Sequence, residues 1–320
     1  MKLDSKICVL GQSGLVGSAL HQRLVADGHT RLIAADRQRI DLREQAQVRA
    51  FFEESRPEYV FMAAGKVGGI VANSTRPAEF IYDNTMMMAN VIEASRRVGV
   101  TKLMLLGSTC IYPKLAPQPI AETALLTGPL EPTNEWYAVA KINAIKIGQA
   151  YRSQYGMDII SVMPTNLYGP GDNFDLTSSH VLPALIRKMH EARTQGLDEV
   201  VIWGTGTPRR EFLHVHDLVD ALIFLMQSYS DEAIINVGTG REVSIGTLAR
   251  VVAETVGFAG NISYDTSKPD GTPLKLSDTS KLFALGWKPT IALEQGIAST
   301  YQWFLEHLQS LRGGRHFPEG

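Results

Sequence analysis

Short apolar runs alternate with amphipathic, helix-like stretches through the first half of this chain. The runs that predict strands are residues 7–10, 31–36, 59–64, 102–108 and 158–165. Strands this uniformly apolar are typical of a sheet covered on both faces, and helices between successive strands make such a sheet parallel. The alternation therefore predicts an α/β fold built on a doubly wound parallel sheet.

The second half of the chain is more mixed. The predicted strands there are 199–204 and 233–238, and the predicted helices are 216–228, 244–257 and 290–308. These elements predict a smaller C-terminal α/β lobe. Asp41, before a predicted helix at 42–55, and Asp217, near the start of 216–228, are placed to cap the first turns of their helices.

Composition excludes several classes of protein. Lys and Arg number 31 against 33 Asp and Glu, with no basic block, so we expect no nucleic-acid-binding surface. No apolar run approaches the roughly 18 residues of a membrane helix, and the run at 7–10 is too short for a signal peptide. Cys8 and Cys110 are too few and too far apart for a disulfide framework. We expect a cytoplasmic protein that binds no membrane.

A glycine-rich turn follows the first predicted strand. Gly11, Gly14 and Gly17 have G-x-x-G-x-x-G spacing at a strand–helix junction, where glycine lets a dinucleotide pyrophosphate approach the backbone. The helix N-terminus then offers free N–H groups to the phosphates. Residues expected to contact a dinucleotide in this turn are Gly11, Gln12, Ser13, Gly14, Leu15, Val16 and Gly17. A purely structural tight turn is the alternative.

The end of the second predicted strand bears on the coenzyme. Asp36 stands where an acidic residue usually binds the adenosine ribose hydroxyls, which favours NAD(H). Arg37 follows it and is suited to the extra phosphate of NADP(H). The two residues favour different coenzymes, and the residues alone leave the choice open.

The glycine turn indicates which part of the expected fold binds a dinucleotide and leaves the rest to bind the substrate. We predict a dinucleotide-binding domain of residues 1–165 and 214–238, and a substrate-binding lobe of residues 166–213 and 239–320 that closes over the substrate.

A tyrosine, a lysine and a serine form the strongest catalytic pattern. Tyr137 and Lys141 lie four residues apart at the start of a predicted helix, hence on one face. A nearby ammonium is expected to lower the pKa of the phenol, which is ordinarily near 10. Ser108 ends a predicted strand at the edge where open α/β folds bind ligands. A surface helix pair is the alternative for the tyrosine and lysine alone.

With the glycine turn, these residues resemble the extended short-chain dehydrogenase/reductase superfamily along nearly the whole chain. Further segments resemble, within it, the GDP-4-keto-6-deoxy-D-mannose 3,5-epimerase–4-reductases. Among them are KVGGIVANSTRPAEFIYDN, GSTCIYPK, EPTNEWYAVAK, SVMPTNLYGPGDNF, WGTGTPRREFLHV and SKPDGTP. The resemblance implies epimerisation at C3 and C5 of this GDP-sugar, then NADPH-dependent reduction at C4, giving GDP-L-fucose.

Cys110 gains a role from this resemblance. In an extended segment alternate residues share a face, so Cys110 is expected to point to the substrate with Ser108. A thiol is a plausible base once a cationic neighbour favours its thiolate. The resemblance assigns Cys110 as the base and His180 as the acid, with Ser108, Tyr137 and Lys141 completing the catalytic set. A small buried hydrophobe is the alternative for Cys110, and the interpretation for Cys8.

The resemblance also implies binding residues. The coenzyme contacts it adds are Asp36, Arg37, Leu106, Gly107, Ser108, Thr109, Lys141, Pro164, Thr165, Asn166, Leu167 and His180. The substrate contacts it implies are Lys188, Trp203, Arg210 and Asp270, with Arg187 an adjacent alternative to Lys188. Relatives carry an arginine in the glycine turn where this chain has Ser13, which weakens the NADP(H) preference; Arg37 keeps NADP(H) favoured over NAD(H).

Other interpretations remain. A nucleotide-sugar 4-epimerase that holds NAD tightly would need neither Cys110 nor His180, and a dinucleotide-sensing protein would need no catalytic set. The histidines of the sequence HVH at 214–216 have metal-ligand spacing without a further ligand cluster, and we expect no metal. The superfamily resemblance implies a homodimer, with the helix that begins near Tyr137 as a candidate interface.

Overall fold

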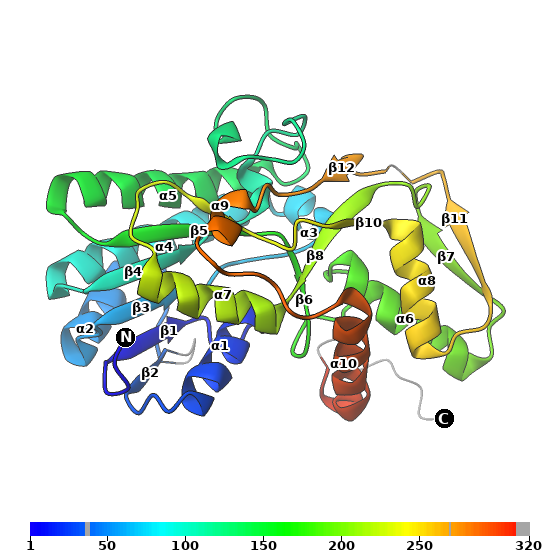
Figure 1. Ribbon diagram of the computed structural model, residues 1–320, viewed down its shortest axis with the longest axis horizontal. Coiled ribbons are helices and arrows are strands. Elements are labelled where there is room, and N and C mark those ends of the chain that lie inside the picture. The colour runs from blue at the N-terminus through cyan, green and yellow to red at the C-terminus, as the bar shows by residue number, and fades with distance from the viewer. Residues whose placement is uncertain (36–38, 269, 312–320) are drawn as a thin grey trace.

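The computed structural model describes residues 1–35, 39–268 and 270–311, and a six-stranded sheet forms its larger part (Figure 1). The strand order is β2-β1-β3-β4-β5-β9, and every neighbouring pair is parallel. The strands are β1 (Ile7–Leu10), β2 (Leu32–Ala35), β3 (Tyr59–Met62), β4 (Lys102–Leu106), β5 (Ile159–Pro164) and β9 (Ile235–Val237). The predicted doubly wound α/β fold is confirmed.

Helices cover both faces of this sheet. The helices of the chain are α1 (Leu15–Ala26), α2 (Gln45–Ser55), α3 (Ile70–Thr75), α4 (Pro77–Val98), α5 (Glu135–Tyr155), α6 (Val181–Gln195), α7 (Val215–Ser228), α8 (Ile245–Val256), α9 (Ser280–Ala284) and α10 (Leu293–Glu306). Helices α1 and α7 pack on one face, and α2, α4 and α5 on the other (Figure 1). No described helix is both long and apolar enough to cross a bilayer.

The sequence of β1 is apolar throughout because both faces of the strand are buried. Its side chains point alternately to the two faces, so Ile7 and Val9 join the core under α1 and α7. Cys8 and Leu10 join the opposite core, under α2 and α4. Cys8 is fully buried there, as the interpretation of a small core residue requires.

Shorter strands form the smaller part of the molecule. They are β6 (Asn166–Tyr168), β7 (Glu199–Trp203), β8 (Arg209–His214), β10 (Glu242–Ser244), β11 (Asn261–Asp265) and β12 (Leu274–Lys275). Strand β8 pairs with β6, β10 and β12, while β7 pairs with β11. A separate core joins them to α6, α8 and α10. Exact domain boundaries stay a prediction.

The two expected helix caps are wrong. Helix α2 begins at Gln45, and Asp41 instead accepts a hydrogen bond from the Arg43 N–H at 2.9 Å, in a turn before the helix. Helix α7 is capped by the ring of His214, because Asp217 is drawn across the fold to Thr290 and Ile291, whose backbone N–H groups donate to it. A distant partner overrides the local capping preference in the second case.

A buried carboxylate joins the two parts of the molecule. Glu211 of β8 has no exposed surface. Its Oε1 accepts hydrogen bonds from the N–H groups of Thr239 and Gly240, both at 2.7 Å, and its Oε2 accepts one from Ser277 N–H at 3.0 Å. These charge-assisted bonds tie β8 to the turn after β9 and to the segment after β12.

We expect Glu211→Gln to lower the free energy of unfolding by about 1–3 kcal/mol, because the amide cannot accept from all three donors and one N–H stays buried without a partner. Denaturant unfolding followed by circular dichroism measures the change. The control is Glu242→Gln on the neighbouring strand, whose half-exposed ion pair with Arg209 is worth at most about 0.5 kcal/mol. An equal decrease in the free energy of unfolding in both variants would show that the buried bonds of Glu211 stabilise the fold no more than a surface ion pair does.

Candidate active site

The glycine turn lies at the point where the strand order reverses, since β1 has β2 on one side and β3 on the other. Open α/β sheets bind ligands at such a point. Gly11 has φ +93°, and a Cβ there would lie 2.7 Å from Ala64 N. A Cβ on Gly17 would lie 2.1 Å from Gly11 O, whereas one on Gly14 would come no closer than 3.4 Å. The turn therefore requires glycine at Gly11 and Gly17.

This turn suits a pyrophosphate. Helix α1 begins at Leu15 with no acidic residue in its first turn, so its N-terminal N–H groups can serve an anion without a competing carboxylate. Gln12 and Ser13 belong to this turn, and Val16 is the second residue of α1. The amide nitrogen of Gln12 lies 2.6 Å from His21 Nδ1. Asp36 and Arg37 lie outside the described residues.

Tyr137 and Lys141 lie at the start of α5, beside the end of β4. The Lys141 ammonium donates to the Leu106 carbonyl oxygen at 2.7 Å and lies 5.6 Å from the centre of the Tyr137 ring. Phe80 packs edge-on against that ring, with 6.4 Å between ring centres. The pair therefore meets the strand end that carries Ser108, as the sequence predicted.

The expected lowering of the tyrosine pKa is wrong for this structure. Desolvation raises the pKa of Tyr137, and the nearby Cys110 raises it further. Desolvation lowers the pKa of Lys141 to about 8, although the nearby Cys110 acts to raise that pKa. Burial therefore favours the neutral phenol of Tyr137.

Cys110 lies near the same point, though not for the expected reason. Residues Thr109–Ile111 form a 3₁₀ turn rather than an extended segment, so strand alternation does not apply. The turn instead folds Cys110 N–H back onto Ser108 Oγ, at 3.3 Å. The residue is 7% exposed and packs with Ile111 and Tyr112, but its side chain also interacts electrostatically with charged groups.

Opposing effects set the acidity of this thiol. Burial raises the pKa of Cys110 above its ordinary value, while Lys275, Ser108 and Lys141 act to lower it. Lys275 is the larger of the two cationic influences. Sequence reasoning missed Lys275, although the SKPDGTP block that precedes it was recognised.

His180 is the last residue before α6, and it remains accessible to solvent. Neighbouring atoms crowd its ring, and the resulting desolvation lowers its pKa, which favours neutral imidazole. The adjacent chain bonds to another loop, since Gly69 N–H donates to Ser178 O at 3.2 Å. His180 therefore stands where the 178–180 segment meets the loop before α3.

The remaining residues expected at the coenzyme lie at the ends of β4 and β5. A Cβ on Gly107 would come within 2.4 Å of the Met163 side chain, so close packing explains this glycine. Pro164 ends β5, and Thr165 N–H donates to Val237 O at 3.1 Å. Thr109 is buried in the 3₁₀ turn. Asn166 and Leu167 lie in β6, where the Asn166 amide donates to Glu211 O at 2.8 Å.

The predicted substrate contacts fall into two groups. Trp203, at the end of β7, is 59% exposed. The ammonium groups of Lys188 and Lys268 lie 6.0 and 5.7 Å from its ring centre. Arg187 is buried and bonds Glu191 at 2.7 Å, so Lys188 is the member of the adjacent pair that reaches this surface.

The second group is Arg210 and Asp270, which interact electrostatically. Asp270 accepts hydrogen bonds from Thr205 N–H at 2.9 Å and Thr205 Oγ1 at 2.7 Å. Arg210 donates to the Thr272 carbonyl, and burial lowers its pKa. Asp270 is therefore fixed by the loop that follows β7, and Arg210 by the loop that follows β11.

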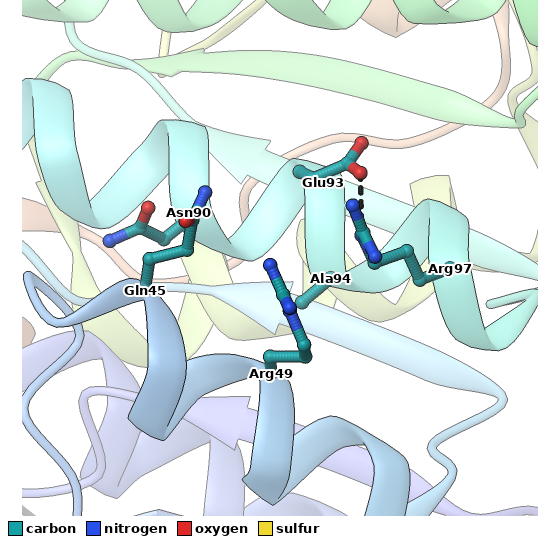
Figure 2. Close-up of a pocket in the computed structure, with 6 residues that line it drawn as sticks. All are labelled: Gln45, Arg49, Asn90, Glu93, Ala94 and Arg97. Atoms are coloured by element: carbon teal, nitrogen blue, oxygen red, sulfur yellow. Dashed lines mark hydrogen bonds and ion pairs between the residues drawn. The ribbon is translucent and has the colours of Figure 1, made fainter.

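A small polar hollow lies elsewhere, between α2 and α4 (Figure 2). Its lining residues are Gln45, Arg49, Asn90, Glu93, Ala94 and Arg97. Its empty volume of about 180 Å³ is below the range of small-molecule sites. None of the predicted site residues lines it, so the candidate active site is defined by its side chains rather than by this hollow.

His214, the last residue of β8, and His216, in the first turn of α7, pack against each other. His214 is buried, with its ring 5.4 Å from that of Tyr168 and 4.9 Å from that of His216. Burial lowers the pKa of His214 to about 4. Over the residues described, no group of three or more His, Cys, Asp or Glu side chains could hold a metal ion.

Comparison with known proteins agrees with this geometry. Residues 7–238 match the NAD dependent epimerase/dehydratase family. The chain is 56% identical over 308 residues to a probable GDP-L-fucose synthase 1 of Oryza sativa subsp. japonica, covering 96% of this chain and 94% of that protein. It is 50% identical over 317 residues to the GDP-L-fucose synthase of Escherichia coli K12, covering 96% and 99%.

The chain belongs to the GDP-L-fucose synthase family. A solved structure, a GDP-L-fucose synthetase from Naegleria fowleri bound to NADP, is 33% identical with a TM-score of 0.90, covering 98% of this chain and 97% of that one. Membership of the GDP-L-fucose synthase family confirms the predicted superfamily.

We expect Gly17→Ala to weaken NADPH binding at least tenfold and to lower the melting temperature, because its Cβ would overlap the Gly11 carbonyl and open the phosphate turn. The matched control is Gly14→Ala in the same turn, whose Cβ fits at ordinary contact distance. Fluorescence titration with NADPH measures both variants. Equal affinity in Gly17→Ala and the parent protein would show that the turn does not hold the coenzyme.

Proposed function

We propose that this protein converts GDP-4-keto-6-deoxy-D-mannose to GDP-L-fucose, by epimerising C3 and C5 and then reducing C4 with NADPH. The observation that carries the proposal is the position of Cys110. Cys110 belongs to the cluster on which Tyr137 packs, and its thiol interacts electrostatically with Tyr137 and Lys141, so the epimerisation base lies close to the reductase pair. High identity to GDP-L-fucose synthases over nearly the full chain supports this assignment.

In the epimerisation, the Cys110 thiolate removes the proton from a carbon beside the C4 ketone. The C–H electrons move into an enolate, whose oxygen accepts hydrogen bonds from Tyr137 and Ser108. His180 returns a proton to the opposite face of the same carbon, and the cycle is repeated at the second carbon. The lowered pKa of His180 disfavours its charged form in the free protein, and the negative diphosphate of the substrate favours it again.

In the reduction, Tyr137 donates its phenolic proton to the C4 oxygen. NADPH, when bound, supplies the hydride that reaches C4. The raised pKa of Tyr137 suits this step, because the residue must hold a proton at neutral pH before it can donate one. Lys141 fixes the geometry through its bond to Leu106 O.

NADP(H) is the coenzyme we assign. The requirement for glycine at Gly11 and Gly17 and the unobstructed start of α1 fit its pyrophosphate. The related Naegleria structure contains NADP. Arg37 is the residue we assign to the extra phosphate, and NAD(H), favoured by Asp36 and Ser13, is the competing coenzyme that the experiment below compares.

We further propose that the GDP-sugar lies between a dinucleotide-binding domain of residues 1–165 and 214–238 and a lobe of residues 166–213 and 239–320. The six strands of the parallel sheet all fall in the first set. Arg210 and Lys188 supply cations for the diphosphate, while Trp203 and Asp270 complete the substrate contacts. Two free cysteines suit a reducing compartment, and we place the protein in the cytoplasm.

The decisive experiment supplies GDP-4-keto-6-deoxy-D-mannose in heavy water, with NADPH or NADH. We expect deuterium at C3 and C5, GDP-L-fucose as product and faster turnover with NADPH. Cys110→Ser should slow deuterium incorporation at least 100-fold while changing GDP-sugar affinity less than about threefold, because serine is a far weaker base. Mass spectrometry and NMR measure each step.

Tyr137→Phe is the matched control, since it removes the proton donor of the reduction while leaving coenzyme binding in place. It should abolish GDP-L-fucose formation. Equal deuterium incorporation in Cys110→Ser and the parent would remove the thiol from the mechanism. Inversion at C4 alone, without net use of the coenzyme, would instead indicate a nucleotide-sugar 4-epimerase with bound NAD.

We also propose that the protein is a homodimer paired through α4 and α5. Tyr82 on α4 and Val139 and Tyr155 on α5 are exposed apolar side chains on these helices. Burying such groups against a second copy is favourable.

Sedimentation should therefore give twice the mass of one chain. Tyr82→Glu with Val139→Glu should halve that mass at micromolar concentration, because the charges would be buried at the interface. Val201→Glu, at an equally exposed apolar position on β7, is the control and should leave the mass unchanged. A monomeric parent protein would contradict the proposal.

A further inference from the structure

The segment after β12 is bonded closely to the neighbourhood of Cys110. Leu276 N–H donates to Gln118 Oε1 at 2.8 Å, and Ile120 N–H donates to Leu276 O at 2.7 Å. Asp278 N–H then donates to Ile120 O at 2.9 Å. Ile120 belongs to the same packed cluster as Cys110, so these bonds attach the segment to the cluster that contains the thiol.

Two buried side chains hold this segment in place. Glu211 accepts from Ser277 N–H at 3.0 Å. The Asn236 amide donates to Ile120 O at 2.9 Å and to Asp278 O at 3.1 Å, and its oxygen accepts from Tyr112 OH at 2.6 Å. The backbone from 276 to 278 is therefore fixed from both parts of the molecule.

Lys275 immediately precedes this fixed segment. It pairs in register with Arg210 across β12 and β8, so both side chains leave the same face of the small sheet. That face is the one on which Arg210 meets Asp270 and Glu131. Lys275 is thereby directed to the site from the small sheet. Tyr137, in contrast, lies on α5, and His180 lies directly before α6.

The surroundings of Lys275 leave its ammonium available. Among the described residues it forms no hydrogen bond or ion pair, and the nearby Glu131 carboxylate is bound by Lys114 at 3.0 Å. The other cation close to Cys110, Lys141, already donates to Leu106 O. A partly buried ammonium without a partner needs a compensating negative charge.

We propose that Lys275 is the counter-charge of the Cys110 thiolate, and so sets the fraction of the base that is ready to take a proton from the sugar. The inference deepens the proposed epimerisation and rests on it for its purpose. Lys275 acts through Cys110 rather than on the sugar, and is a positioning residue in that sense.

The coupling between the two groups is mutual. Lys275 acts to lower the pKa of Cys110, and Cys110 acts to raise the pKa of Lys275, while burial opposes the charge on both. The other titratable groups facing this pair are Lys141, Tyr137, Arg210 and Glu131. Ionisation of the neutral thiol beside the ammonium converts one costly isolated charge into a pair of opposite charges.

The test measures the thiol directly, without a sugar substrate. The rate of Cys110 alkylation by iodoacetamide, followed by mass spectrometry of its peptide from pH 6 to 10, rises with the thiolate fraction. In Lys275→Met we expect the midpoint to move to higher pH, and alkylation at pH 8 to slow roughly tenfold, because less of the thiol is ionised. Cys8 is fully buried and does not interfere.

Matched variants separate charge from structure. Lys275→Arg retains the positive charge and should restore most of the parent midpoint. Lys268→Met removes a lysine near Trp203 instead and should leave the midpoint unchanged. NADPH affinity and melting temperature establish that each variant is folded, and Lys275→Gln replaces Lys275→Met if the latter is not.

An unchanged midpoint in the folded Met or Gln variant would overturn the proposal, whether or not the KM for the GDP-sugar rises. A rise in KM with no shift would show instead that Lys275 contacts substrate. Failure of the proposed function is distinguishable, because it would show as undiminished deuterium exchange in Cys110→Ser, whatever the alkylation profile of Lys275→Met.

Discussion

The hydrogen bonds of the buried Glu211 carboxylate hold the two parts of this molecule in one arrangement. One oxygen binds the turn after β9, at the edge of the parallel sheet, and the other binds Ser277, beyond β12. A carboxylate with no exposed surface is costly unless its acceptors are filled. Filling them requires both segments to be in place at once.

The chemistry of the site depends on that arrangement. Strand ends and α5 position Ser108, Tyr137 and Lys141, while the 3₁₀ turn places Cys110 beside Ser108. The segment fixed by Glu211 and Asn236 follows directly after Lys275, the larger of the two cationic influences on Cys110. Burial favours protonated Tyr137, as the proposed reduction requires, and burial of Cys110 makes a cation necessary if the thiol is to ionise.

Much of the fold and the site could be predicted from sequence. The apolar runs predicted the sheet, because strands buried on both faces allow few polar residues. The glycines at Gly11 and Gly17 predicted a tight turn, and the structure shows the short Cβ distances to neighbouring backbone that require glycine there. The Tyr137–Lys141 spacing predicted one helix face, since four residues make about one turn. Each of these follows from local geometry.

Other features depended on contacts between distant segments. The position of Asp217 predicted a helix cap, but its carboxylate instead accepts hydrogen bonds from the N–H groups of Thr290 and Ile291. Cys110 was expected in an extended segment, yet a turn brings it to Ser108. Lys275 is far from Cys110 in sequence, and the pairing of β12 with β8, together with the bonds of Leu276 to Gln118 and Ile120, brings it near. The sequence by itself determined the sheet, the glycine turn and the helix face, because these depend on near neighbours. Tertiary structure decided the pKa shifts and the charges that surround the thiol, because burial and long-range charge depend on how distant segments pack.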